Sequence, residues 1–463
     1  MTDIELIRTP SLGDNSYLVV SGDEAAVIDP QRDAWPLVRM CAGRGIAVRY
    51  VLETHVHNDY VSGAREWQAA TGAAIVGPAR AAYSFPYTPI DDGDEIALGD
   101  ATLRALATPG HTPEHTAYLL LDAGAPDPTA VFTGGSLMVG GAGRTDLLGP
   151  DRTDELTRSQ FASLGRLLTL GEQTRVLPTH GAGSFCAAPT SGPTTSTIGA
   201  ERLTNPALQL LADEREFVRA RLDGLPRYPA YYRYMAPINR SGPRVLVGPP
   251  PLPSLATDEV ARQLDAGAWM VDARDRWAFA RAHVPGSINV ELDDAFATFV
   301  GSVVPFGVPL MLLLPEPSAA AATEAVTQLL RIGYDTVAGC FAGGVAAWEA
   351  ADRAVNSYPA RGIDELDVAD PGVVVLDVRQ PAERADGAIP GSRHIVLGDL
   401  PQRMNELPRD RTVWTVCRSG HRAAIAASLL DRAGIAVTAV ARGGVPTSGR
   451  DRGLRQYSEA GRK

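Results

Sequence analysis

Histidine is concentrated in the first 180 residues of the chain, at positions that could hold a metal ion. Five of the eight histidines lie there, each on a loop-like stretch after an apolar run: His55, His57, His111, His115 and His180. Neutral imidazole is the commonest transition-metal ligand in proteins. Two imidazoles in one short loop, with further histidines on later loops, therefore predict a metal centre in this part of the chain.

A second chemical group lies near the other end of the chain. The segment 416–423 (VCRSGHRA) follows an apolar run and opens an alanine-rich stretch of helical length. Backbone amides in a tight loop at a helix N-terminus attract an anion, and this field, together with Arg418 and Arg422, favours a thiolate. We therefore predict that Cys417 is a reactive nucleophile.

A tandem repeat must position Cys417. Segments that begin at Asp272 (DARD, then HVPGSIN) and at Asp377 (DVRQ, then AIPGSRH) resemble each other with one constant offset. Each copy alternates apolar runs (269–271, 310–314; 373–376, 413–416) with helix-length segments (319–330; 423–433). Such alternation predicts a doubly wound parallel sheet with helices on both faces. We expect domains at 1–250, 254–352 and 358–460, with an amphipathic helix over 205–222 at the end of the first.

The histidine-rich region resembles the metallo-β-lactamase superfamily. The motifs that carry the resemblance are THVHNDY at 54–60, TPGHT at 108–112, TGG at 133–135 and the late His180. The resemblance implies an αβ/βα sandwich with metal-binding loops at one edge of its two sheets. It also implies a metal held by residues from the set His55, His57, His111, Asp59 and His180.

Two residues depart from the family pattern. Tyr60 stands where the family has a second-site histidine, and Gly135 stands where it has a bridging aspartate. A two-metal hydrolase uses both residues, so we expect one metal ion at most. If the loop keeps the family path, Gly135→Asp is expected to add a ligand. Arg144 and Asp146 are interpreted either as a structural ion pair or as a site that positions a substrate carboxylate.

The cysteine segment resembles the rhodanese family, whose active cysteine begins a C-x-x-G-x-R loop and carries a persulfide. The resemblance makes Cys417 catalytic and assigns substrate binding to the loop residues Arg418, Ser419, Gly420, His421 and Arg422. In the first copy the matching loop, 314–319 (LPEPSA), has neither cysteine nor arginine, so that copy is expected to be inactive. Cys41, Cys186 and Cys340 are interpreted as packing residues, although Cys186 follows the His180 loop closely enough for a functional role.

The order of the domains resembles persulfide dioxygenase–rhodanese fusion enzymes. The resemblance implies that one Fe(II) per chain, with zinc as the alternative metal, oxidises a low-molecular-weight thiol persulfide with oxygen to sulfite. It also implies that Cys417 exchanges sulfur with thiols and thiosulfate. Two other hypotheses stay open. The chain is a sulfurtransferase alone with a degenerate first domain as a binding module, or it is a zinc-dependent thiolester hydrolase of the glyoxalase II type.

Composition limits the compartment and the partners. The formal net charge is −11, with 45% hydrophobic and 21% charged residues. An acidic chain argues against nucleic acid as a partner, because phosphate neutralisation needs clustered positive charge. We find neither a stretch long enough to span a membrane nor a signal-like N-terminus, so we expect a cytoplasmic protein with no membrane partner. A homo-oligomer remains open.

Overall fold

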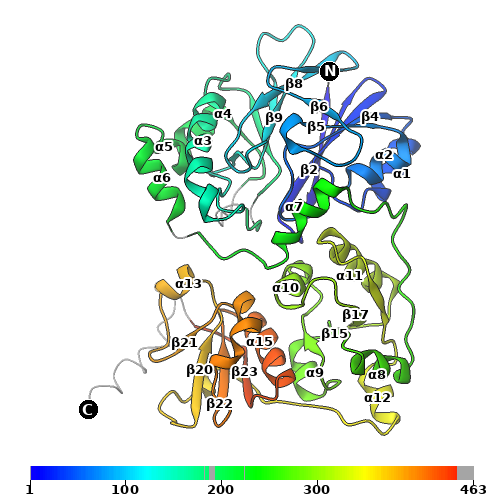
Figure 1. The fold of residues 1–463 in the computed structure, drawn as a ribbon, viewed down its shortest axis with the longest axis vertical. Coiled ribbons are helices and arrows are strands. Elements are labelled where there is room, and N and C mark those ends of the chain that lie inside the picture. Colours follow the sequence, from blue (N-terminus) through cyan, green and yellow to red (C-terminus); the bar gives the residue numbers. More distant parts are fainter. Residues whose placement is uncertain (1, 182, 187–192, 224, 446–463) are drawn as a thin grey trace. The chain divides into compact units, whose positions relative to one another are not determined.

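The computed structural model describes the chain except residues 1, 182, 187–192, 224 and 446–463, and it divides into two compact units (Figure 1). The first unit contains Met1–Pro250 and Thr327–Gly333, and the second contains Pro251–Val326 and Tyr334–Lys463. The domain boundaries expected from the sequence stay predictions, and the last of them, 460, lies outside the described residues.

The first unit is built on two six-stranded sheets. The strands of the first sheet, in spatial order, are β1 (Asp3–Thr9), β2 (Asp14–Ser21), β3 (Glu24–Ile28), β4 (Ala47–Leu52), β5 (Ala74–Pro78) and β6 (Thr88–Ile90). The second sheet has the order β14 (Ser196–Thr197), β13 (Arg175–Pro178), β10 (Ala130–Gly134), β9 (Thr116–Leu121), β8 (Ala101–Ala107) and β7 (Glu95–Leu98). A hairpin of β11 (Leu137–Met138) and β12 (Gly141–Ala142) follows β10. Central strands such as β2 and β10 are buried along their whole length, because both faces of each sheet are covered.

Helices cover the outer faces of both sheets. They are α1 (Trp35–Gly43), α2 (Ala64–Thr71), α3 (Pro150–Leu167), α4 (Ile198–Thr204), α5 (Pro206–Gln209), α6 (Glu214–Leu222) and α7 (Tyr232–Ser241). Side chains from both sheets, among them Tyr17, Leu52, Tyr118 and Phe132, form one buried cluster between the sheets. Separate clusters join α1 and α2 to the first sheet, and α3 to α6 to the second. The expected αβ/βα sandwich is confirmed.

The single amphipathic helix expected over 205–222 is wrong. The chain forms α5 and α6 instead, because two polar side chains each begin a new helix. The Asn205 side chain accepts a hydrogen bond from the Ala207 amide, and the Asp213 side chain accepts one from the Arg215 amide. An amide-capping side chain satisfies backbone donors at a helix start, which favours a break at that residue.

The second unit contains the two repeat copies, each with its own sheet. The first has β16 (Ile288–Asn289), β15 (Trp269–Asp272), β17 (Leu310–Leu313) and β18 (Val337–Cys340), with α8 (Thr257–Asp265), α9 (Arg276–Arg281), α10 (Phe296–Val303), α11 (Ala319–Arg331) and α12 (Gly344–Ala350). The second has β19 (Ala360–Gly362), β23 (Val437–Arg442), β22 (Thr412–Val416), β20 (Val373–Asp377) and β21 (Arg393–His394), with α13 (Pro381–Ala385), α14 (Leu400–Arg403) and α15 (His421–Arg432). All described pairs in both sheets are parallel, as the repeat predicts.

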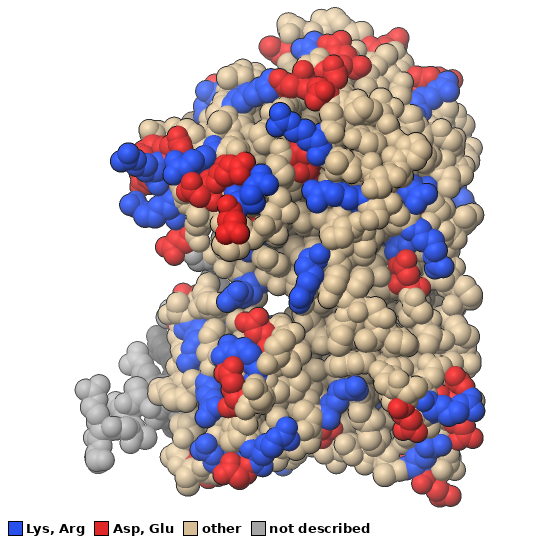
Figure 2. Space-filling view, viewed as in Figure 1, with Lys and Arg blue, Asp and Glu red and all other residues tan. Residues whose placement is uncertain are grey.

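Charge is distributed without a continuous basic surface on the face drawn in Figure 2, where arginine side chains lie among acidic ones. Within the described residues, none of the helices has the length and the apolar character needed to cross a bilayer.

Candidate metal centre and cysteine loop

The histidines of the first unit meet where several strands end. His55 and His57 follow β4, His111 lies between β8 and β9, and His180 follows β13. All four side chains are at most 1% exposed. The ring of His55 lies centroid to centroid 4.2 Å from His57, 4.9 Å from His111 and 5.4 Å from His180. The structure therefore brings these four predicted residues together.

Hydrogen bonds set the ring proton of His55. The Thr54 hydroxyl donates to Asp29 Oδ2 at 2.7 Å, so at its other side it accepts from His55 Nδ1 at 2.8 Å. With the proton on Nδ1, the second nitrogen, Nε2, keeps its lone pair. Burial and the neighbouring imidazoles hold the pKa of His55 well below its usual value, so the ring is neutral.

His111 has the same arrangement. Its Nδ1 donates to the backbone carbonyl of Arg144 at 2.7 Å, and its Nε2 is buried with no hydrogen-bond partner among the described residues. Burial and the nearby His180 lower the pKa of His111 to about 3. A backbone carbonyl that fixes the tautomer of a histidine is a usual support for a metal ligand. Because an unpartnered buried nitrogen costs free energy, this side chain fits a bound cation.

His57 is held from its outer side by carboxylates. Its Nε2 lies 2.8 Å from Glu53 Oε2 and 3.3 Å from Asp29 Oδ1, while Nδ1 has no partner in the described part of the chain. Burial opposes the charged ring, but Asp29 and Glu53 hold the pKa of His57 well above its usual value. A carboxylate behind the ring orients it and raises its basicity as a ligand through Nδ1. The Tyr60 hydroxyl also contacts His57 Nε2, at 3.0 Å, and donates to the Asp29 carbonyl.

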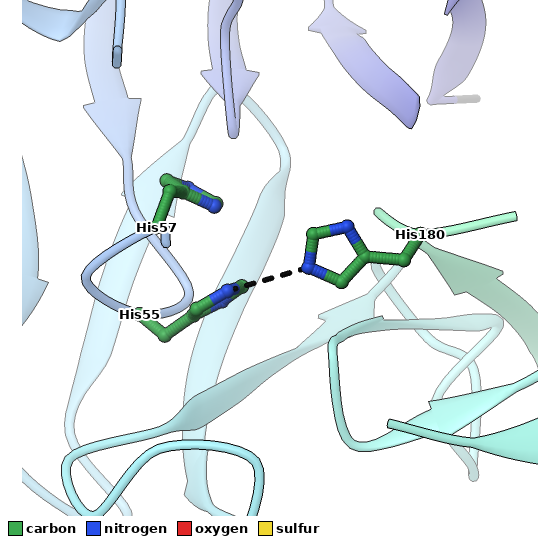
Figure 3. A group of neighbouring side chains, drawn as sticks. All are labelled: His55, His57 and His180. Atoms are coloured by element: carbon green, nitrogen blue, oxygen red, sulfur yellow. Dashed lines mark hydrogen bonds between the residues drawn. The ribbon is translucent and has the colours of Figure 1, made fainter. Parts of the chain in front are cut away.

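His180 faces His55 across the centre. Figure 3 shows the two rings pointing toward each other, with a dashed line between their Nε2 atoms, which are 3.4 Å apart. Behind the ring, Nδ1 lies 2.8 Å from Asp14 Oδ1 and 3.2 Å from Asp59 Oδ2. Although burial opposes the charge, Asp59 and Asp14 raise the pKa of His180 to about 10. A bound metal ion displaces such a ring proton.

Asp14 is a residue of this centre that the sequence motifs did not indicate. It begins β2 and is 1% exposed. Burial and the Asp59 carboxylate raise the pKa of Asp14 to about 7. Asp59 itself approaches His180, and its pKa lies below the usual value because His180 outweighs burial. The structure therefore places Asp59 beside His180 as predicted and adds a second carboxylate behind that ring.

The two departures from the family pattern change the centre differently. Tyr60 is buried in the His57 network and offers a phenol in place of an imidazole. At Gly135, an added Cβ would lie 2.2 Å from His111 Cδ2, so the ring of His111 occupies the room that a side chain would need. An aspartate at this position can add a ligand only if the His111 ring first moves, so this contact weighs against the predicted gain.

The donor set fits a metal ion. Ring nitrogens of His55, His57 and His180 lie within 4.8 Å of one another, and carboxylate oxygens of Asp14 and Asp59 lie within the same distance of His180. Imidazoles with unshared lone pairs suit zinc, iron, copper or nickel. His115 does not join them, since its Nε2 accepts from the Gly135 amide at 2.9 Å and its Nδ1 contacts Thr108.

Asn239, from α7, is a second residue that the motifs did not indicate. Its amide donates to the carbonyls of His57 and Tyr60 at 2.9 and 2.8 Å, and its oxygen accepts from the Ser62 amide at 2.9 Å. Because Asn239 is only 3% exposed, these bonds compete little with water. The helix α7 therefore holds the loop of the first two histidines.

Arg144 holds the loops around the centre together. Its guanidinium pairs with Asp146 through two contacts of 2.7 Å and donates to the Phe185 carbonyl at 3.0 Å. The aromatic ring of Tyr228 lies against the same guanidinium, with 4.7 Å from the carbon of the cation to the ring centre. Arg144 and Asp146 therefore form an ion pair that holds neighbouring loops together, which is one of the two roles expected from the sequence. The other role, contact with a substrate carboxylate, stays a prediction.

Cys417 lies where the sequence places it, between β22 and α15. The Gly420 amide donates to its sulfur at 3.1 Å, and Gly420 has a φ of 93°, a conformation that favours glycine. An amide aimed at the sulfur is the arrangement that stabilises a thiolate or a persulfide anion. Cys417 is buried, while the next two residues of the loop, Arg418 and Ser419, are exposed.

Arg422, the last residue of this loop, is paired with a carboxylate. Its guanidinium makes two contacts with the Glu383 carboxylate, at 2.6 and 2.7 Å, and Glu383 also accepts from the Gln380 amide at the start of α13. Burial opposes the charge, but Glu383 raises the pKa of Arg422. The ion pair therefore positions Arg422 at the rim of the loop.

The first repeat copy contributes directly to the surroundings of this loop. Arg276 donates to the Ser419 carbonyl at 3.3 Å, and His421 faces Glu291 and Asp293 at 3.9 and 3.5 Å. The copy that lacks a cysteine therefore supports the loop of the copy that has one.

The comparisons with known proteins place both parts of the chain in known families. Residues 12–180 match the model of the metallo-beta-lactamase superfamily, and residues 256–351 and 364–446 match the rhodanese-like domain. Hydroxyacylglutathione hydrolase of Rhodospirillum rubrum is 30% identical over 236 residues, which cover 50% of this chain and 83% of that protein. The enzyme of the same name from Cereibacter sphaeroides is 29% identical over 60% of this chain and 96% of its own length.

Among solved structures, a metallo-beta-lactamase from Staphylococcus aureus aligns with a TM-score of 0.66 and 28% identity, over 73% of this chain and 98% of its own. ETHE1 from Myxococcus xanthus aligns over 52% of this chain and 98% of its own with 28% identity and a TM-score of 0.44. With its family motifs, its sandwich fold and its repeated parallel sheets, the chain belongs to the metallo-beta-lactamase superfamily, and its metallo-beta-lactamase domain is followed by two rhodanese-like domains.

Proposed function

We propose that this chain is an enzyme of sulfur metabolism that joins a metal-dependent persulfide dioxygenase to a sulfurtransferase. The observation that carries the proposal is the presence in one chain of a buried imidazole centre and of a cysteine loop with an amide aimed at its sulfur. The substrates are a low-molecular-weight thiol persulfide, oxygen and thiosulfate.

The sulfurtransferase step belongs to Cys417. Its thiolate attacks the outer sulfur of thiosulfate, the sulfur–sulfur bond breaks, and sulfite leaves with the electron pair. The Gly420 amide faces the Cys417 sulfur, which carries the negative charge while it is a thiolate; in the persulfide the charge lies on the outer sulfur. A small thiol then attacks the outer sulfur of the Cys417 persulfide, which releases a thiol persulfide and restores the thiolate.

At the other centre His55, His57, His111 and His180 would hold the metal ion. One redox-active ion, Fe(II), would supply the electron transfer that oxygen needs and that zinc lacks. The chain itself fixes the ring tautomers through Thr54, Glu53 and the Arg144 carbonyl, and it excludes water by burying all four rings. The overall reaction turns one persulfide, one oxygen molecule and one water into thiol and sulfite.

Metal analysis and product analysis of the full chain test the proposal. We expect near-stoichiometric iron after anaerobic purification and persulfide-dependent oxygen uptake. When persulfide is supplied and sulfite accumulates, the transfer at Cys417 runs in the reverse direction: a second persulfide passes its outer sulfur to the Cys417 thiolate, and sulfite then takes that sulfur and leaves as thiosulfate. The Cys417→Ser variant should therefore accumulate sulfite at the same oxygen uptake. A chain without metal and without oxygen uptake, but with sulfurtransferase activity, would overturn the dioxygenase.

The similarity to hydroxyacylglutathione hydrolases supports a second candidate, a zinc-dependent hydrolase of thiolesters. In that case the histidine centre would hold zinc, and the ion would supply a hydroxide nucleophile at neutral pH. Gly135 and Tyr60 weigh against it, because they remove two side chains of the two-metal site. Zinc in the purified protein together with thiolester hydrolysis would favour this candidate over the first.

A further inference from the structure

Cys186 lies inside the metal centre although it is outside the family's ligand motifs. It follows the His180 loop and is fully buried. Its sulfur and the ring nitrogens of His111 and His180 all lie within 4.8 Å of one another. A buried thiol among two imidazoles is a donor group of the kind that holds zinc or iron.

The nearest imidazole has an unused donor atom. His111 Nε2 is buried with no hydrogen-bond partner in the described residues, while its Nδ1 is used by the Arg144 carbonyl. Gly135 stands where the family pattern has an aspartate, so no carboxylate reaches His111 Nε2 from this position. The centre therefore has a free lone pair and lacks the expected negative ligand.

One residue holds both donors in place. The backbone amide of Arg144 donates to the Cys186 carbonyl at 3.1 Å, and its guanidinium donates to the neighbouring Phe185 carbonyl at 3.0 Å. The carbonyl of the same Arg144 accepts from His111. Such support from outside the donor set is typical of a metal site.

We propose that the sulfur of Cys186 is a ligand of the metal ion, together with His111 and His180, and that it replaces the carboxylate missing at position 135. The inference rests on the metal centre of the proposed function but not on persulfide oxidation. When the ion binds, the thiol proton and the Nε2 proton of His180 pass to the solvent, and the thiolate supplies one negative charge. Thiolate with imidazole favours a soft or borderline divalent ion over magnesium or calcium.

Titration of the metal-free full chain with Co(II) tests the inference. A thiolate ligand gives a sulfur-to-cobalt charge-transfer band in the near ultraviolet, which nitrogen and oxygen ligands do not give. We expect one such band per bound ion in the wild type and its loss in Cys186→Ser, with Co(II) affinity reduced more than about tenfold. All of these proteins carry Cys417→Ser in addition, so that the reactive thiol of the second unit cannot produce the band.

Cys41→Ser is the matched control, because Cys41 is a buried cysteine of the same unit that lies on α1 and outside the centre. It should keep the band and the affinity. A wild type that binds Co(II) without the band, or a folded Cys186→Ser that keeps it, would overturn the inference and leave the histidine centre standing. A folded wild type that binds no Co(II) at all would overturn the metal centre itself. Thermal unfolding of the metal-free proteins separates both results from a folding defect.

Discussion

Gly135→Ala tests how tightly the His111 ring packs against position 135. The added Cβ would lie 2.2 Å from His111 Cδ2 and 2.7 Å from Nε2, whereas ordinary carbon contacts begin at about 3.5 Å. The ring must therefore retreat by about 1 Å. That movement breaks its hydrogen bond of 2.7 Å to the Arg144 carbonyl.

The expected cost follows from these two contacts. Overpacking of a buried site costs about 1–3 kcal/mol, and loss of one buried hydrogen bond costs about 1 kcal/mol. Together they lower the free energy of unfolding of the first unit by about 2–4 kcal/mol, a fall of roughly 5–15 °C in its unfolding temperature. Because His111 leaves its position, metal affinity should fall by more than about tenfold. Gly135→Asp should behave in the same way rather than tighten binding.

Calorimetry of the full chain provides the assay. The transition of the first unit is identified by its shift when metal is added, since a ligand of the folded state raises its unfolding temperature. Gly141→Ala is the matched control, because nothing lies within 4 Å of a Cβ there and its backbone needs no positive φ. Equal unfolding temperatures and equal metal affinities in the two variants would refute the reasoning.

Three further predictions concern contacts around the two sites. Glu383→Gln leaves Arg422 without its carboxylate, so the KM for thiosulfate should fall about two- to fivefold at low ionic strength and the effect should vanish in high salt; an unchanged KM would contradict this role. Asn239→Ala removes bonds to two buried carbonyls and one amide, and it should lower the free energy of unfolding by about 2–4 kcal/mol and weaken metal binding in the same titration. Asp431→Ala removes the partner of His283, 3.0 Å away in the first copy, and should lower the unfolding temperature of the second unit without changing metal affinity.

Much of both sites could be predicted because their residues lie in contiguous motifs. The loop from Cys417 to Arg422 could be recognised because its motif occupies six consecutive residues. The strand before it and the helix after it could be predicted from the hydrophobic pattern of neighbouring residues. His55, His57, His111 and His180 come from separate loops, but each loop carries its own motif.

The residues that could not be predicted act through pairings that are distant in sequence. Asp14 meets His180 across 166 positions, and Asn239 meets His57 across 182. Single Asp and Asn residues have no spacing that distinguishes them from surface residues. The close approach of the His111 ring to position 135 could not be predicted either, because it depends on where that ring packs and not on the backbone angle of Gly135. Only the packed structure contains that information.

Asp29 has a consequence for how this scaffold tolerates change. It directly follows β3 in a left-handed conformation, with a φ of 49°, and its carboxylate accepts from the amide and hydroxyl of Thr54 and the hydroxyl of Thr179. These are the residues just before His55 and His180, so the histidine loops are tied together by a protein carboxylate and not by the ion. Exchange of a single metal ligand would leave this tie between the two loops in place. Mutations that exchange one ligand for another then change the chemistry without removing the fold, which is a route by which one architecture can acquire several activities.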